Sequence, residues 1–169
     1  MTLQEYVKGL SEDKRFKIAV ELTKQALPIW DSYADKHKLT YRDPENGLSQ
    51  HIDRHLLGNI IEAIETYLKS DSSEKTTNKE DQLEELSKQF DDPIVALEDA
   101  IWIVPKEIEI LFFSVYNLME SIIGKEQNEI DETLIYTSIN QAADALIKNK
   151  LKTFHEIIQM CRDISSEKK

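Results

Sequence analysis

The sequence contains few of the residues that interrupt or cross-link a chain. Its 169 residues include four glycines, four prolines and one cysteine. A single cysteine, Cys161, cannot form a disulfide within the chain, and nothing else indicates an oxidising compartment. Because turn-forming residues are scarce, the helical spacing of apolar residues becomes the dominant pattern.

Long apolar runs are also missing. The densest apolar stretch, residues 108–119, is interrupted by Glu109, Ser114 and Asn117, so we predict no membrane-spanning segment. The first residues show no basic stretch followed by an apolar one, so no signal peptide is predicted. A cytoplasmic location is therefore the default expectation.

Recognisable catalytic motifs are absent as well. The chain has no glycine-rich phosphate loop, no Gly-x-Ser-x-Gly elbow, no His-Glu-x-x-His and no Glu-x-x-His of the di-iron type. Cys161 has no histidine within a helical turn, so we interpret it as a packing residue and not as a nucleophile. We predict a protein that is not an enzyme and binds no cofactor.

The composition is nevertheless that of a folded chain. Hydrophobic residues make up 40% of the sequence, and 169 residues suit a single domain with a proper core. We predict an all-α fold, one domain over residues 1–169, built as a bundle of about six or seven helices. Its buried central helix should lie near residues 108–123, which are apolar around most of the helix circumference.

The expected helices follow from apolar spacing and from capping residues. The predicted segments are 3–10, 12–38 with Pro28 inside it, 48–69, 81–90, a segment from Asp92-Pro93 to Gly124 that breaks at Val104-Pro105, 128–148 and 151–164.

Two connections stand out between these helices. Asn46-Gly47 is typical of a β-hairpin, but no alternating strands flank it, so residues 40–47 are predicted to be a connection. Asp43-Pro44 could equally be a helix N-cap followed by a proline of the first turn. Residues 70–80 contain no apolar residue and are predicted to form a flexible polar loop.

The net charge of −11 is unevenly distributed. Residues 1–61 are neutral overall, whereas residues 62–109 carry fourteen acidic and five basic residues. No basic face is available for nucleic acid, so we predict no nucleic-acid binding, and no membrane binding. The acidic region permits a basic protein partner, although acidity that only maintains solubility is the alternative explanation. The predicted partner-binding residues are Glu80, Asp81, Glu84, Glu85, Asp91, Asp92, Glu98 and Asp99.

Two histidines form the only candidate for a metal site. His51 and His55 are four residues apart, a spacing that places two imidazoles on one face of a helix. Two surface histidines are the simpler interpretation, so no metal site is predicted. Asp53 falls within the apolar stripe of the same predicted helix, where a carboxylate of the first turn, a buried ion pair or a catalytic acid are the alternatives.

Several short strings, in their order along the chain, suggest a family. They are Arg15-Phe-Lys-Ile-Ala-Val-Glu-Leu22, Leu27-Pro-Ile-Trp30, Asp43-Pro44, Gln82-Leu-Glu-Glu-Leu86, Leu118-Met-Glu-Ser-Ile-Ile-Gly124 and Ser138-Ile-Asn-Gln-Ala-Ala143. Over residues 1–148 the chain resembles the YjaG-like family of small bacterial helical proteins of unknown function. The resemblance implies an all-α fold and a bacterial origin, and it supplies no catalytic residues.

These observations favour a non-enzymatic protein that binds another protein. One form of this function is an immunity or antitoxin protein that covers the basic surface of a toxin. The alternative is an enzyme or metal-binding bundle centred on His51, His55 and Asp53. Self-association as a homodimer is a third alternative.

Overall fold

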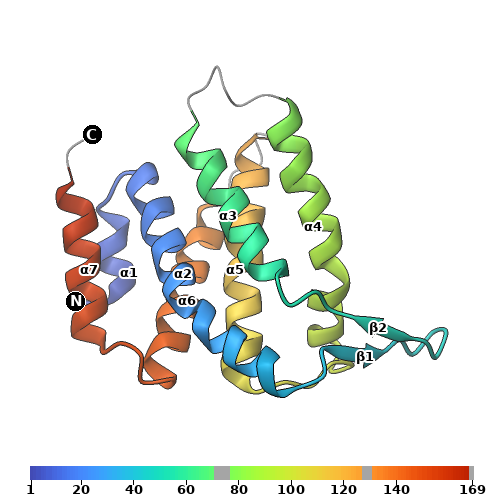
Figure 1. Ribbon diagram of the computed structural model, residues 1–169. Helices are drawn as coiled ribbons and strands as arrows, with labels where there is room; N and C mark the ends of the chain where they lie inside the picture. The colour runs from blue at the N-terminus through green and yellow to red at the C-terminus, as the bar shows by residue number, and fades with distance from the viewer. Residues whose placement is uncertain (71–76, 127–130, 168–169) are drawn as a thin grey trace.

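The computed structural model describes residues 1–70, 77–126 and 131–167. Within these ranges the chain forms a helical bundle with one small antiparallel sheet, so the predicted fold class is confirmed (Figure 1). The elements are α1 (Leu3–Lys8), α2 (Glu12–Lys36), β1 (Thr40–Arg42), β2 (Ser49–His51), α3 (Leu56–Lys69), α4 (Thr77–Glu98), α5 (Lys106–Glu126), α6 (Glu132–Lys148) and α7 (Phe154–Ser166).

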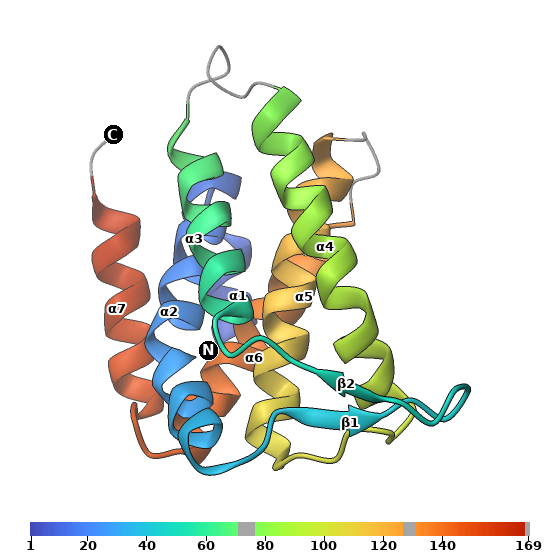
Figure 2. The ribbon, with the colours of Figure 1, turned by 45° about the vertical axis from the view of Figure 1, so that its right-hand side comes forward.

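Helix α5 is the centre of the bundle, as predicted for residues 108–123. It packs against α2, α3, α4 and α6, which surround it in both views of the ribbon (Figures 1 and 2). Its side chains on several faces are fully buried, including Leu111, Phe112, Val115, Leu118 and Met119. An apolar circumference is what a helix needs when other helices cover most of it.

Two serines allow α5 and α6 to approach closely. The Ser114 hydroxyl donates to the backbone carbonyl of Ser138 at 2.7 Å, and the Ser138 hydroxyl donates to the carbonyl of Ser114 at the same distance. Both side chains are fully buried. The reciprocal bonds satisfy both hydroxyl donors inside an apolar interface, where an unpaired donor would be costly.

The first and last helices lie on the side of the bundle away from α4 (Figure 1). The hydroxyl groups of Tyr6 in α1 and Ser165 in α7 are 2.9 Å apart, and Lys14 of α2 donates to the carbonyl of Ser165. Residues near the two ends of the described chain are therefore joined through α2.

A β-hairpin replaces the first part of the helix that we predicted over residues 48–69. Strands β1 and β2 pair antiparallel, with Tyr41 opposite Gln50, and helix α3 begins only at Leu56. Gly47 has a φ of +69°, the left-handed conformation that glycine adopts without steric cost. The prediction failed because each strand has only three residues, too few to show an alternating pattern.

Helix α4 is continuous where we predicted a helix over 81–90 and a new start at Asp92-Pro93. It runs through Pro93, which is buried within it. Proline removes one backbone donor, but the buried side chains of Phe90, Ile94 and Leu97 on either side of it keep the helix packed against the bundle. Of the predicted loop at 70–80, residues 77–80 begin α4, and 71–76 lie outside the described residues.

The remaining boundaries follow local capping. Pro105 precedes α5, so the break predicted at Val104-Pro105 separates two helices. Asp131 caps α6 by accepting from the Thr133 amide at 3.0 Å, whereas the predicted cap, Asn128, lies outside the described residues. A capping box between Thr153 and Glu156 starts α7 at Phe154, three residues later than predicted.

Candidate functional site

The predicted partner-binding residues lie together along the outer side of α4, with Asp99 directly after the last residue of the helix. Their spacing of three, four and seven residues places them on one face of the helix. Glu80 belongs to the first turn, and its side chain is outside the described set. The others are all exposed and are called the acidic face below: Asp81, Glu84, Glu85, Asp91, Asp92, Glu98 and Asp99.

Helix α4 packs against the bundle through the side opposite the acidic face. Leu83, Phe90, Ile94 and Leu97 are buried and hold the helix against α3 and α5. Ser87 donates from this side to the carboxylate of Glu120 on α5 at 3.2 Å. Folding therefore depends on the inner side of α4, and the acidic face remains open to solvent.

The carboxylates of the acidic face are not neutralised within the described part of the chain. None of them forms an ion pair there, although six other ion pairs occur on the surface. Within residues 81–99, Lys88 is the one basic residue, and it lies on the same side of α4 as the carboxylates. Seven exposed carboxylates with a single lysine among them create a net negative local potential that attracts basic molecules.

The field of these carboxylates extends into the interface between α4 and α5. The pKa of Glu120 is raised chiefly by burial; the hydrogen bond from Ser87 opposes this shift, and the negative charge of Asp91 adds to it. Burial likewise raises the pKa of Tyr116, and nearby Glu120, Asp91 and Glu98 add to the effect. These shifts show that several negative charges act on the same short stretch of α5.

A groove lies between the hairpin and the end of α4. Its volume is about 300 Å³. One wall is formed by the hairpin turn and the other by the last turns of α4 and the residues after it. The lining residues are Tyr41, Asp43, Pro44, Glu45, Gln50, Asp92, Val95, Ala96, Asp99 and Ile101. Sequence reasoning missed this groove because it did not predict the hairpin.

The alternative site required His51, Asp53 and His55 to lie in one helix, and the structure places none of them inside a helix. His51 belongs to strand β2, and His55 occupies the position before the first residue of α3, so the two imidazoles do not share a helix face. Asp53 is exposed, not part of a buried stripe, and its carboxylate accepts from the backbone amide of His55 at 2.9 Å. The described ranges contain no cluster of three or more side chains suited to hold a metal ion.

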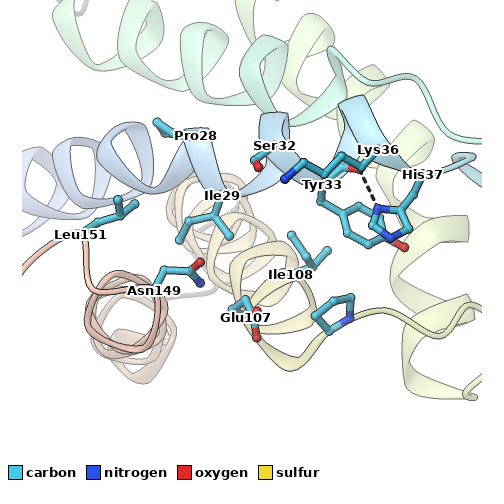
Figure 3. Close-up of a pocket in the computed structure, with 11 residues that line it drawn as sticks. Pro28, Ile29, Ser32, Tyr33, Lys36, His37, Glu107, Ile108, Asn149 and Leu151 are labelled. Carbon is cyan, nitrogen blue, oxygen red and sulfur yellow. Dashed lines mark hydrogen bonds between the residues drawn. The ribbon is translucent and has the colours of Figure 1, made fainter.

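A second cavity, of about 330 Å³, opens between α2, the start of α5 and the segment after α6 (Figure 3). The rings of Tyr33 and His37 stack at 4.1 Å on its edge, and the Nδ1 atom of His37 lies 3.0 Å from the carbonyl of Tyr33. Lys36 and Glu107 also line it, without a hydrogen bond between them or to His37. Titratable side chains from α2, the residue after it and α5 thus line this cavity together.

Cys161 occupies a packing position in α7. It is fully buried, and burial raises the pKa of its thiol to about 11. A thiol held in its neutral form is a poor nucleophile, which agrees with the interpretation made from the sequence.

Comparison of the chain with protein-family models, with curated proteins and with solved structures finds no match. The resemblance to the YjaG-like family thus remains a prediction from sequence. In the part of the chain that the structure describes, no helix is both long enough and apolar enough to cross a membrane.

Proposed function

We propose that this protein binds a basic protein partner through the acidic face of α4. The observation that carries the proposal is the alignment of six exposed carboxylates on one side of α4, with Asp99 directly after it; none of the seven is in an ion pair within the described residues. Such a surface steers a basic partner and accelerates its association.

A partner would also relieve a local electrostatic cost. Asp81 lies three residues before Glu84 and four before Glu85. Like charges at these spacings destabilise a helix by about 0.2–0.5 kcal/mol per pair. Basic side chains placed against these residues add attractions that offset this repulsion.

Within this proposal, an immunity or antitoxin role is the finer hypothesis. A rigid acidic helix can cover the basic surface with which a nuclease-type toxin holds phosphate groups. The protein would then act by occupying that surface, without chemistry of its own.

The experiment compares two variants with equal change in charge. The test variant, Glu84→Gln/Asp91→Asn/Glu98→Gln, neutralises three residues at seven-residue spacing along the acidic face. Each chain is immobilised and exposed to lysate of the source cells, and proteins eluted by salt are identified.

The control variant, Asp31→Asn/Glu132→Gln/Asp163→Asn, neutralises three exposed residues on α2, α6 and α7. We expect a basic protein that the wild-type chain and the control retain and the test variant loses. Capture of the same basic proteins by all three chains, or of none by the wild type, would contradict the proposal.

A further inference from the structure

The groove between the hairpin and α4 combines apolar surface with carboxylates from two elements. Part of its lining is apolar, and Val95 exposes 49% of its surface although it belongs to a helix whose other large aliphatic residues are mostly covered. Tyr41 and Ile101 flank it on the hairpin and on the segment after α4. An exposed valine in the α4 wall offers apolar surface to an inserted side chain.

The rim of the groove is acidic on both sides. The hairpin turn contributes Asp43 and Glu45, and α4 with the residue after it contributes Asp92 and Asp99. No basic residue lines the groove, and none of the four carboxylates forms an ion pair within the described residues.

The carboxylates are close enough to the groove wall to affect Tyr41. Burial raises the pKa of Tyr41, and the charges of Asp92 and Asp43 raise it further. Asp92 and Asp43 come from different elements, so the negative potential converges on the groove from both of its walls.

Apolar surface next to carboxylates from both walls matches one kind of side chain. Arginine packs its aliphatic stem on apolar atoms while its planar guanidinium donates to carboxylates on more than one side. A lysine ammonium is a strongly hydrated point charge that uses the width of such a groove less well. The small volume, about 300 Å³, suits one side chain better than a folded segment.

We propose that this groove receives an arginine side chain of the basic partner. The inference rests on the proposed function, because it gives the acidic face a specific anchor point at its hairpin end. The remainder of the face, from Asp81 to Asp91, then acts by attraction at longer range, while the groove determines which partners stay bound.

The probe for this inference is a peptide, acetyl-Ala-Leu-Arg-Leu-Ala-amide, with citrulline and lysine versions as comparisons. Citrulline has nearly the shape of arginine but no charge. Binding to the full ¹⁵N-labelled chain is followed by the shifts of backbone amides. We expect saturable shifts for Tyr41, Val95 and Ile101 with the arginine peptide, and affinity about tenfold lower with either comparison peptide.

Two variants separate the groove from the general acidity of α4. Asp92→Asn/Asp99→Asn should weaken binding of the arginine peptide by about tenfold. Asp81→Asn/Glu84→Gln makes the same change in charge on the same helix outside the groove and should leave the affinity within about twofold. Val95→Lys, at a position that is 49% exposed, should also abolish the shifts by placing a cation in the groove.

The outcomes distinguish this inference from the proposed function. Absence of saturable shifts, equal affinity for the lysine or citrulline peptide, or equal losses in the two double variants would overturn the arginine groove. None of these results affects capture of a basic protein in the immobilisation experiment. Loss of that capture would in turn contradict the proposed function, whether or not the peptide binds the groove.

Discussion

At the scale of single residues, the interior of this bundle contains few polar side chains, and Ser114 is one whose contribution can be measured. Ser114→Ala removes a hydroxyl that donates to the carbonyl of Ser138 in a buried interface. We expect the free energy of unfolding to fall by about 1 kcal/mol, the usual net value of one hydrogen bond. Urea denaturation measures the change.

A matched control for this substitution is Thr137→Ala on the exposed side of α6. Its hydroxyl also donates to a backbone carbonyl, that of Thr133, but in contact with solvent. We expect a change within about 0.5 kcal/mol. Equal losses in the two variants would show that burial does not determine the contribution of these hydroxyl groups.

Glu120 gives a pH dependence of defined sign. Burial and the charge of Asp91 raise the pKa of its carboxyl group in the folded chain above the ordinary value of 4.5. Folding thus favours the neutral carboxyl group, and the stability linked to it is present below the unfolded pKa and lost as pH rises through the folded pKa. Glu120→Gln should therefore stabilise the protein at neutral pH.

The expected gain for Glu120→Gln is small, because solvent partly screens this half-buried group. The gain should vanish below about pH 4, where the unfolded carboxyl is also protonated. Denaturation at both pH values tests this. Glu62→Gln, at an exposed position of α3, should show no such difference; a gain that persists in acid would contradict the assignment.

At the scale of elements, the two glycines Gly47 and Gly58 should respond to alanine with opposite signs. Gly47 has a positive φ and nothing within 4 Å of an added Cβ. Gly47→Ala should therefore lower the free energy of unfolding by about 1 kcal/mol, through the strain of alanine in the left-handed conformation alone. Gly58 lies inside α3 with equally open space, and Gly58→Ala should gain about 0.5–1 kcal/mol. Thermal melting of both variants gives the comparison, and loss of stability in both would contradict it.

The elements also show which parts of the fold could be predicted from the sequence. Residues 108–123 are apolar on nearly every side, and such a pattern has few outcomes other than a buried helix. The acidic face was predicted as a set of residues, and its helical spacing was already visible in the sequence. Pro93 suggested a helix boundary within this face. In the structure, the packing of Phe90 and Ile94 on neighbouring helices outweighs the local tendency of proline to end a helix.

The groove could not be predicted by the same means. Asp43 and Asp92 are far apart in the chain, and only the hairpin brings their segments together. Asn46-Gly47 was the available indication, but strands of three residues carry no alternation that would support it. Sites built between a short hairpin and a distant helix depend on tertiary packing that single-sequence patterns do not encode.

At the scale of the whole molecule, the charge of −11 is concentrated around α4, where the described residues offer little compensation. Added NaCl screens repulsion among exposed carboxylates, with a Debye length of about 10 Å at 0.1 M. We therefore expect the melting temperature at neutral pH to rise as NaCl is added. The Glu84→Gln/Asp91→Asn/Glu98→Gln variant should show a smaller rise, and a fall in the wild type would contradict this expectation.

The aromatic cluster at the hairpin end has an optical consequence. The chain contains two tryptophans, Trp30 and Trp102, whose rings lie 6.2 Å apart, both edge-on to Phe112. Trp102 is also 6.5 Å from Tyr41, which lines the groove, and the Trp30 indole donates to the carbonyl of Arg54 just after the hairpin. Because both tryptophans lie in this cluster, tryptophan fluorescence, excited at wavelengths where the six tyrosines absorb little, reports on this cluster. A spectral shift on adding a partner would locate the contact there without any attached dye.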